Sequence, residues 1–149
     1  MPVTFLLGSK TDTEFTQKIA DVLKEYGVDS EIIVASAHKV PEKVVSVVEK
    51  LNASKEPMVV ITVVGMSNGL GGVVAGSCVH PVINCPPFKD HDDYLVNIHS
   101  NLQMPSDVPV MTVLNQKNAA LAALRILGES DPDLKMKLME RIRKIKKEY

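Results

Sequence analysis

Polar residues that could bind a ligand follow the first apolar run of the chain, in the segment Gly8-Ser9-Lys10-Thr11-Asp12. Free backbone N–H groups at the start of a helix favour an anion, and the hydroxyls of Ser9 and Thr11 would add donors. Asp12 would repel a phosphate but suits the hydroxyl groups of a ribose. A capping box from Thr11 to Glu14 explains two of the same residues without any ligand. The segment alone therefore leaves both interpretations open, and it matches neither a Walker A loop nor a dinucleotide-binding fingerprint.

A histidine and a lysine follow a second apolar run, in the segment Ser36-Ala37-His38-Lys39. A histidine directly after a buried strand could move a proton at neutral pH. Lys39 beside it supplies positive charge for a phosphate or a carboxylate. A surface loop in which His38 caps a helix or faces water is the simpler explanation of this segment taken alone.

The third polar segment lies inside a long uncharged stretch, because residues 57–88 contain no Asp, Glu, Lys or Arg. Such a stretch could span a bilayer, which needs about 20 apolar residues. Its glycines and prolines instead favour two buried strands joined by a loop and a short helix. The loop, Gly65-Met66-Ser67-Asn68-Gly69, offers backbone N–H groups, a hydroxyl and a carboxamide between apolar strands. It predicts either a dry pocket for a small uncharged ligand or a tight turn at Asn68-Gly69.

The other histidines and the two cysteines do not form a recognisable site. His80, His91 and His99 have no partners at metal-ligand or catalytic-triad spacing, so we expect them in the core or on the surface. Cys78 and Cys85 do not form a C-x-x-C pair, which favours a packing role over a redox or metal role. We therefore expect no metal site, and a reducing compartment is the default for so few cysteines.

Strand-like and helix-like segments alternate five times along the chain with short connections. The expected strands cover residues 3–7, 31–35, 59–64, 82–85 and 108–113. The expected helices cover residues 15–26, 41–51, 70–77, 89–102, 115–127 and 131–148. The alternation predicts an α/β fold, a three-layer αβα sandwich with a flavodoxin-like or Rossmann-like parallel sheet and an extra C-terminal helix. Ligands of such sheets bind beyond the carboxyl ends of the strands, where the three polar segments are expected to meet.

Length and composition limit the classes of function. With 149 residues, 45% of them hydrophobic, the chain is expected to form one globular domain, 1–149. No basic leader precedes the first strand, so we expect a cytoplasmic protein. The last helix, 131–148, carries a surplus of Lys and Arg, but apolar residues recur in it at helical spacing: Leu134, Leu138, Met139, Ile142 and Ile145. This amphipathic pattern favours docking on a neighbouring element or subunit over binding to nucleic acid.

Taken together, the polar segments resemble those of the PurE family of de novo purine biosynthesis, and the resemblance covers nearly the whole chain. The first segment matches the family's G-S-x-S-D, with Thr11 in place of the second serine. The run Ser36-Ala37-His38-Lys39-x-Pro41 matches S-A-H-[RK]-x-P. Two further family segments follow in the same order, Gln103-Met104-Pro105 and Lys117-Asn118-Ala119-Ala120-Leu121.

The family contains two kinds of enzyme. A mutase moves a carboxylate from the amino nitrogen to the ring carbon of 5-aminoimidazole ribonucleotide (AIR), and its G-G-A-A-H-L-P-G loop places a second histidine where this chain has Gly69. A direct carboxylase, the class II type, adds CO2 to AIR and carries G-R-S-N-G-L. The run from Gly65 to Leu70 resembles the second kind, as do Lys39 and Cys85-Pro86-Pro87. Met66 departs from it, because the direct carboxylases have an arginine there.

The resemblance implies a reversible carboxylation of C4 of AIR with CO2, without ATP, biotin, metal or any other cofactor. It implies that His38 removes the C4 proton, that Asp12 binds the ribose hydroxyls and that Met104 flanks the imidazole. The ribose phosphate would be bound by Ser9, Ser36 and Lys39, with Thr11 and Ala37 in the same binding segments. The pocket for CO2 and the new carboxylate would be formed by Gly65, Met66, Ser67, Asn68 and Gly69.

Two alternatives remain at this stage. One is the mutase, and the other is a non-catalytic nucleotide-binding module in which His38 would be dispensable. Members of the family typically assemble as homo-octamers with C-terminal helices packed on neighbours. We therefore expect a homo-oligomer, with AIR and CO2 as ligands and neither nucleic acid nor membrane as partner.

Overall fold

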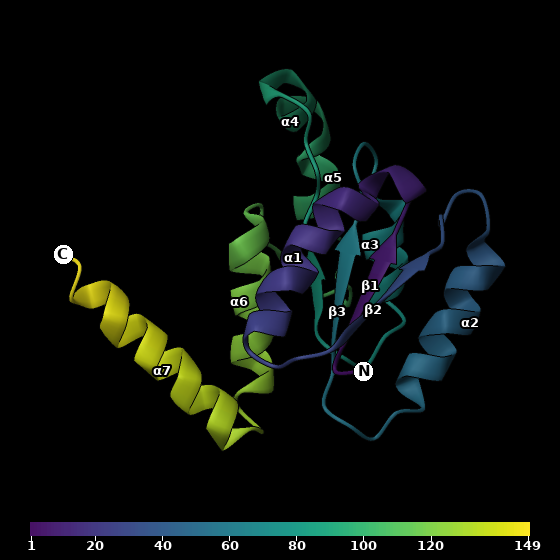
Figure 1. Ribbon diagram of the computed structural model, residues 1–149. Helices are drawn as coiled ribbons and strands as arrows, with labels where there is room; N and C mark the ends of the chain where they lie inside the picture. Colours follow the sequence, from purple (N-terminus) through teal and green to yellow (C-terminus); the bar gives the residue numbers. More distant parts are fainter.

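Five parallel strands form a single sheet in the order β2-β1-β3-β4-β5 (Figure 1). The computed structural model describes all residues, 1–149. The strands are β1 (Val3–Leu7), β2 (Ser30–Val34), β3 (Val59–Val63), β4 (Val82–Asn84) and β5 (Met111–Thr112). This is the strand order of the flavodoxin-like fold, so the predicted fold class is confirmed.

The two central strands, β1 and β3, are buried along their whole length and pair with each other in parallel register. Because side chains alternate between the two faces of a strand, Phe5 and Ile61 belong to one hydrophobic cluster and Leu6 belongs to another. Both faces of these strands are therefore covered. This explains why their sequences are continuous runs of apolar residues rather than alternations.

Helices form the outer two layers. On the face of Phe5 lie α1 (Thr13–Glu25), α6 (Gln116–Leu127) and the first turns of α7 (Pro132–Lys146). On the face of Leu6 lie α2 (Pro41–Asn52) and α3 (Gly69–Ala75). Figure 1 shows the sheet between these two layers, with the carboxyl ends of β1 and β3 pointing upward.

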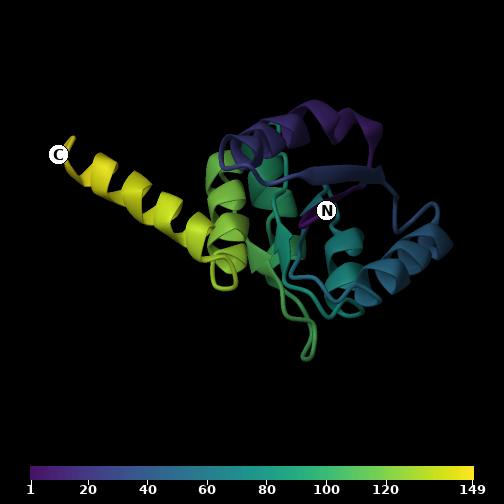
Figure 2. The same ribbon diagram turned by 60° about the horizontal axis from the view of Figure 1, so that its bottom comes forward.

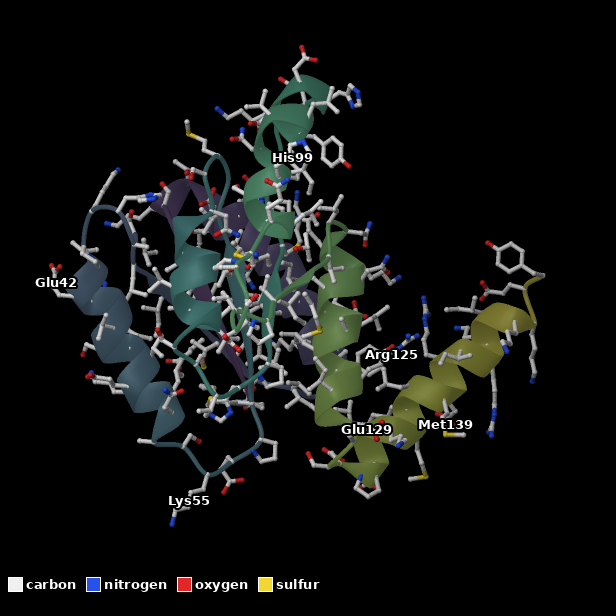
Figure 3. All side chains as sticks on the ribbon, turned by 180° about the vertical axis from the view of Figure 1, so that it is seen from behind. Glu42, Lys55, His99, Arg125, Glu129 and Met139 are labelled. Atoms are coloured by element: carbon white, nitrogen blue, oxygen red, sulfur yellow. The ribbon has the colours of Figure 1, made fainter.

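Two expected elements differ from the observed ones. The strand expected over 108–113 contributes only Met111–Thr112 to the sheet, at the edge beside β4. Pro109, which has no N–H to donate, lies just before that pairing begins. The helix expected over 89–102 is divided at Ile98 into α4 (His91–Asn97) and α5 (His99–Leu102). These two short helices project beyond the carboxyl edge of the sheet (Figures 1 and 3), and Figure 3 labels His99 on them.

The C-terminal helix α7 extends away from the rest of the chain (Figure 2). Asp131 caps its first turn by accepting hydrogen bonds from the N–H groups of Asp133 and Leu134. Leu134 and Leu138 are buried in the core, whereas the next apolar residues along the stripe, Met139, Ile142 and Ile145, are exposed. Figure 3 shows Met139 on the part of the helix that no other element covers. None of the helices has the length and apolar character needed to cross a bilayer.

Candidate active site

Three loops at the carboxyl ends of β1, β2 and β3 enclose a pocket of about 310 Å³. In the sheet, β2 lies on one side of β1 and β3 lies on the other. The pocket is at this switch point of the topology, which is the usual ligand position in this architecture. The residues that line it come from all three polar segments: Gly8, Ser9, Asp12, Ser36, His38, Val64, Gly65, Met66 and Ser67. The predicted convergence of the three segments is therefore found in the structure.

The first loop folds around Ser9. Its Oγ accepts hydrogen bonds from the backbone N–H of Thr11 at 3.3 Å and from the Thr11 hydroxyl at 2.9 Å. These bonds close a short 3₁₀ turn, Lys10–Asp12 (η1), ahead of α1. The N-cap residue of α1 is Asp12, without a side-chain capping bond, so the capping box from Thr11 to Glu14 does not form.

Asp12 lines the pocket with its carboxyl group partly buried. Loss of hydration raises the pKa of that carboxyl above its ordinary value, and polar groups of Ser9 and Thr11 oppose the shift. A partly desolvated carboxylate accepts hydrogen bonds strongly. Asp12 is thus suited to accept them from neutral hydroxyl donors.

His38 lies over the backbone of Gly69. A Cβ atom on Gly69 would be 2.6 Å from Nε2 of the His38 ring, closer than any real contact. The ring nitrogens form no hydrogen bond within the chain, and the side chain is exposed. Both nitrogens are therefore free to form hydrogen bonds with a ligand in the pocket.

The two neighbours of His38 have different surroundings. Ala37 packs against the hydrophobic cluster below the loop. Lys39 is exposed and does not line the pocket. The lysine therefore makes no contact inside the pocket.

The third loop presents backbone rather than side-chain donors. The N–H groups of Met66, Ser67 and Gly69 form no hydrogen bond with the rest of the chain. Met66 has a left-handed backbone with φ of 55°, and its side chain is 72% exposed. Gly65, Met66 and Ser67 all line the pocket.

Asn68 was expected to donate hydrogen bonds into the pocket, but it is buried and only 4% exposed. Its Oδ1 accepts from the N–H of Gly71 at 2.7 Å, and its Nδ2 donates to Oδ1 of Asn101 at 2.6 Å. The carboxamide is thus used within the fold, as the N-cap of α3 and as a tie to α5. Within this chain it is not free to bind a ligand.

Met104 does not line the pocket either. It is half-buried, and its sulfur faces α3, 3.5 Å from the position that a Cβ on Gly72 would take. The structure therefore brings the three strand-end loops together but leaves Met104 beside them.

Comparison with known proteins shows the family of this chain. The model of the family described as AIR carboxylase matches residues 2–148. The chain belongs to the AIR carboxylase family. Members of this family, also named PurE, are enzymes of purine biosynthesis.

Individual AIR carboxylase relatives carry two different names. A protein of Archaeoglobus fulgidus, named phosphoribosylaminoimidazole carboxylase, is 39% identical over 94% of this chain and 76% of its own. A protein of Methanocaldococcus jannaschii, named N5-carboxyaminoimidazole ribonucleotide mutase, is 38% identical over 97% of this chain and 90% of its own. The chain spans only 29% of a bifunctional carboxylase/succinocarboxamide synthetase of Drosophila melanogaster, at 42% identity.

Among solved AIR carboxylase structures, the crystal structure of Treponema denticola PurE superposes with a TM-score of 0.91. The two proteins are 36% identical, and the match covers 98% of this chain and 92% of that one. The agreement extends to the whole fold, including the C-terminal region.

Two residues that contact the loop of this AIR carboxylase family member were not expected from the sequence. Ser100 and Asn101 belong to α5 and hydrogen-bond to Asn68. The only signal for them in the sequence is their position just before the Gln103-Met104-Pro105 motif. Asn101 is 1% exposed, and a fully buried asparagine needs hydrogen-bond partners.

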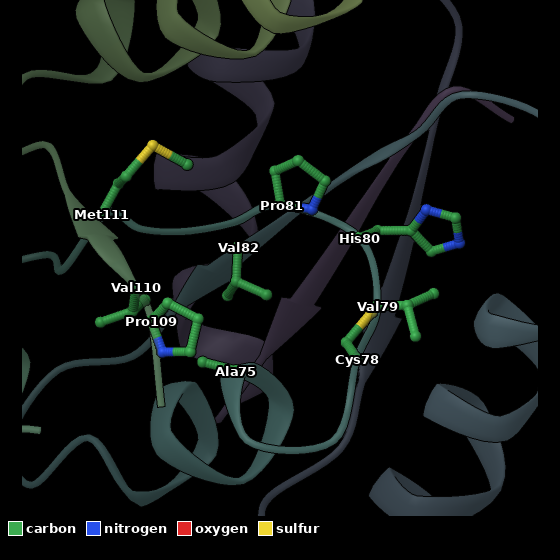
Figure 4. A pocket seen from close by; sticks show the side chains of 9 residues that line it. All are labelled: Ala75, Cys78, Val79, His80, Pro81, Val82, Pro109, Val110 and Met111. Atoms are coloured by element: carbon green, nitrogen blue, oxygen red, sulfur yellow. The ribbon is translucent and has the colours of Figure 1, made fainter. Parts of the chain in front are cut away.

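A larger hollow, of about 480 Å³, lies at the opposite end of the strands, where β4 and β5 begin (Figure 4). Apolar side chains line most of it, and His80 at its rim hydrogen-bonds through Nε2 to the carbonyl of Leu51 at 2.9 Å. Burial raises the pKa of the Cys78 thiol there, and it raises the pKa of Cys85 in the core to about 12. Both cysteines therefore remain neutral thiols, consistent with packing roles.

Proposed function

We propose that this protein is the direct carboxylase of its family, which adds CO2 to C4 of AIR reversibly and needs no cofactor. One observation carries the proposal: the ring of His38 occupies the space over Gly69, where a mutase would carry its second histidine. The pocket therefore has one histidine for proton transfer. Direct carboxylation needs one such group, whereas the mutase also needs a group that protonates the departing nitrogen.

The chemistry of the substrate reduces the work of the enzyme to positioning. The amino group of AIR pushes electrons into the imidazole ring, so C4 is already nucleophilic. CO2 is an electrophile that requires no activation if it is held close to that carbon and away from water. Val64 and the backbone of Gly8 and Gly65 provide a largely uncharged part of the pocket wall for this purpose.

The pocket and the residues beside it offer a group for each part of the substrate. Ser9 and Ser36 line the pocket and would donate their hydroxyls to the phosphate, and the exposed Lys39, next to His38 in the chain, would add positive charge. Asp12 accepts hydrogen bonds from the ribose hydroxyls. Met104 stands on the α3 side of the loop and would flank the imidazole.

Negative charge develops on the CO2 oxygens as the new C–C bond forms. The unpaired N–H groups of Met66, Ser67 and Gly69 are donors fixed before the reaction, so they stabilise the forming carboxylate without reorganisation. His38 then takes the proton from C4 to restore the aromatic ring, and in the reverse direction it returns that proton. The role of Asn68 in this scheme is to shape the loop rather than to donate with its carboxamide.

The mutase remains the second candidate, because the Methanocaldococcus jannaschii relative carries that name at similar identity. The two activities differ in the substrate that they consume. The purified protein is mixed with AIR and bicarbonate-derived CO2 in the absence of ATP, and the carboxylated product is followed by its ultraviolet absorbance. A parallel reaction receives the N-carboxylated ribonucleotide.

Rapid product formation from AIR and CO2 supports the direct carboxylase. Consumption of the N-carboxylated ribonucleotide faster than its spontaneous loss of CO2 would overturn it in favour of the mutase. Absence of both activities would favour the non-catalytic module.

The protein is also proposed to form a homo-oligomer, an octamer by family resemblance. The exposed apolar residues Met139, Ile142 and Ile145 of α7 support this, since a row of such residues on a projecting helix is stabilised by a second copy. Light scattering on the eluting peak of a size-exclusion column measures the mass. A monomer at micromolar concentration contradicts this part of the proposal.

A further inference from the structure

Two residues of α5, Ser100 and Asn101, hold the loop 65–69 although neither lines the pocket. The backbone N–H of Asn68 donates to Oγ of Ser100 at 3.0 Å. The carboxamide Nδ2 of Asn68 donates to Oδ1 of Asn101 at 2.6 Å. Both bonds join residues more than thirty positions apart in sequence, so the loop and α5 are fixed to each other by tertiary rather than local contacts.

The same serine also contacts the strained residue of the loop. Met66 has φ of 55°, a left-handed conformation that residues with a side chain adopt only where the surroundings enforce it. Oγ of Ser100 lies 3.3 Å from the carbonyl oxygen of Met66 and 2.9 Å from that of Asn97. Its single hydrogen can therefore go to either acceptor. One hydroxyl thus touches the chain on both sides of Ser67.

Asn101 is itself fixed in place. Its Nδ2 lies 3.3 Å from the carbonyl of Asn97, and its own carbonyl accepts from the hydroxyl of Thr112 in β5 at 3.0 Å. A buried side chain with these partners has little freedom to move. Through its hydrogen bond, Asn101 therefore fixes Asn68 relative to α5 and to β5 at the edge of the sheet.

The consequence concerns the direction of the free backbone donors. The N–H groups of Met66 and Ser67 are directed by the torsion angles of residues 65–67, which the contacts of Ser100 and Asn101 constrain. CO2 carries no net charge, so its binding depends on the placement of donors rather than on long-range attraction.

We propose that Ser100 and Asn101 are positioning residues for the CO2 site: they hold the left-handed turn at Met66 so that the free N–H groups of the loop face the pocket. The inference rests on the proposed function for the identity of the ligand. The holding of the loop itself does not depend on which reaction the protein catalyses.

The test uses Ser100→Ala in the full-length protein, with two readouts. Hydrogen exchange of the backbone amide of Asn68, the N–H in this loop that Ser100 binds, is followed without ligand by mass spectrometry of peptides that contain residue 68, and it is expected to become faster. The KM for CO2 is expected to rise about three- to tenfold, the range expected for the loss of one hydrogen bond, while the KM for AIR stays unchanged. Ser100→Thr keeps the hydroxyl and is expected to restore both values.

A matched control is Ser54→Ala. Oγ of Ser54 also accepts from a backbone N–H, that of Glu56 at 3.2 Å, but it lies after α2 at the other end of the sheet. This variant should change neither the exchange at Asn68 nor either KM. Asn101→Leu, similar in size but without the acceptor, is expected to resemble Ser100→Ala if it folds.

Different results contradict different parts of the proposal. Unchanged exchange at Asn68 in Ser100→Ala overturns the holding role, whatever the protein catalyses. Faster exchange with an unchanged KM for CO2, in a wild-type protein that carboxylates AIR, overturns the positioning role. If the wild type does not carboxylate AIR, the proposed function fails, and the KM for the N-carboxylated ribonucleotide is compared instead. A protein that uses neither substrate overturns the positioning role and leaves the exchange result to decide the holding role.

Discussion

The imidazole of His38 lies directly over Gly69, with Nε2 only 2.6 Å from where a Cβ atom on that glycine would be. The glycine is therefore required by the position of the histidine. In Gly69→Ala the added methyl group must displace the ring. Because a displacement of a reacting group by about 1 Å can reduce turnover about 100-fold, we expect a loss of that order in AIR carboxylation, measured as the initial rate at saturating AIR and CO2.

A second substitution at the same position tests whether a second histidine fits beside His38 and confers mutase activity. Gly69→His supplies the second histidine of the mutases, but its side chain would collide with His38. We expect this variant to lose carboxylase activity without gaining use of the N-carboxylated ribonucleotide. Gain of that activity would show that the pocket can hold both rings, against the geometry described above.

His38 itself is expected to act as the proton acceptor at C4. His38→Asn retains a polar group of similar size but cannot accept a proton at neutral pH. The rate of carboxylation should fall about 10²- to 10⁴-fold, the usual contribution of a general base. Binding of AIR, measured by calorimetry, should change little. Full turnover in this variant would remove His38 from the chemistry.

The sequence was sufficient to predict the central strands because each is a long apolar run that is buried on both faces. It was less informative at the edge of the sheet. The run 108–113 looks like a strand of six residues, but β4 offers only three, and β5 pairs over two. The length of an edge strand depends on the length of the strand beside it, and the local sequence of the edge strand does not contain that information.

The site shows the same division between local and tertiary information. The Thr11-x-x-Glu14 pattern predicts a capping box. In the structure the Thr11 hydroxyl instead donates a hydrogen bond to Oγ of Ser9. Asn68 looks like a pocket donor in a small polar loop. Its partner Asn101 lies beyond the helix break at Ile98, and no periodicity in the sequence indicates that contact. The position of the loops was predictable, whereas the partners of their side chains were not.

Met66 stands where the direct carboxylases have an arginine. Its side chain is exposed at the pocket, so a longer charged side chain has room to reach the ligand. Met66→Arg is expected to lower the KM for CO2 several-fold, since a guanidinium would stabilise the forming carboxylate. Met66→Gln, neutral and of similar length, is the control. If the KM for CO2 is the same in both variants and the wild type, position 66 does not contact the carboxylate.

Asp12 links ligand binding to stability. Its pKa is raised in the folded protein by loss of hydration, so the charged form destabilises the fold relative to the unfolded chain. The neutral variant Asp12→Asn is expected to have a higher free energy of unfolding than the wild type at pH 7. That advantage should shrink as the pH falls through the raised pKa toward 3.8, the ordinary value, because the wild-type carboxyl then becomes protonated as well.

Urea unfolding at pH 7 and at several lower pH values measures this difference. The affinity for AIR should fall in Asp12→Asn at pH 7, since the amide is a weaker acceptor for the ribose hydroxyls. Asp29→Asn, at an exposed position between α1 and β2, is the matched control and should change neither quantity. A wild type that gains no stability relative to Asp12→Asn on acidification contradicts the burial argument.

Gly71 lies between two buried carboxamides behind the loop. A Cβ there would overlap Oδ1 of Asn84 and lie 2.7 Å from Nδ2 of Asn68. Neither group can move freely, because Asn84 accepts from the hydroxyl of Thr62 and Asn68 donates to Asn101. Overpacking of this kind costs about 1–3 kcal/mol, so Gly71→Ala is expected to lower the free energy of unfolding by that amount.

The neighbouring glycine provides the control for Gly71→Ala. A Cβ on Gly72 would meet only the side chain of Met104, with the sulfur nearest at 3.5 Å, which is an ordinary contact. Gly72→Ala should therefore raise the free energy of unfolding by about 0.5–1 kcal/mol, the usual gain for alanine over glycine inside a helix. Chemical denaturation of both variants measures the difference in sign. Equal effects at the two positions would mean that the carboxamides of Asn68 and Asn84 can rearrange, and the tie between the loop and α5 would then be looser than the hydrogen bonds indicate.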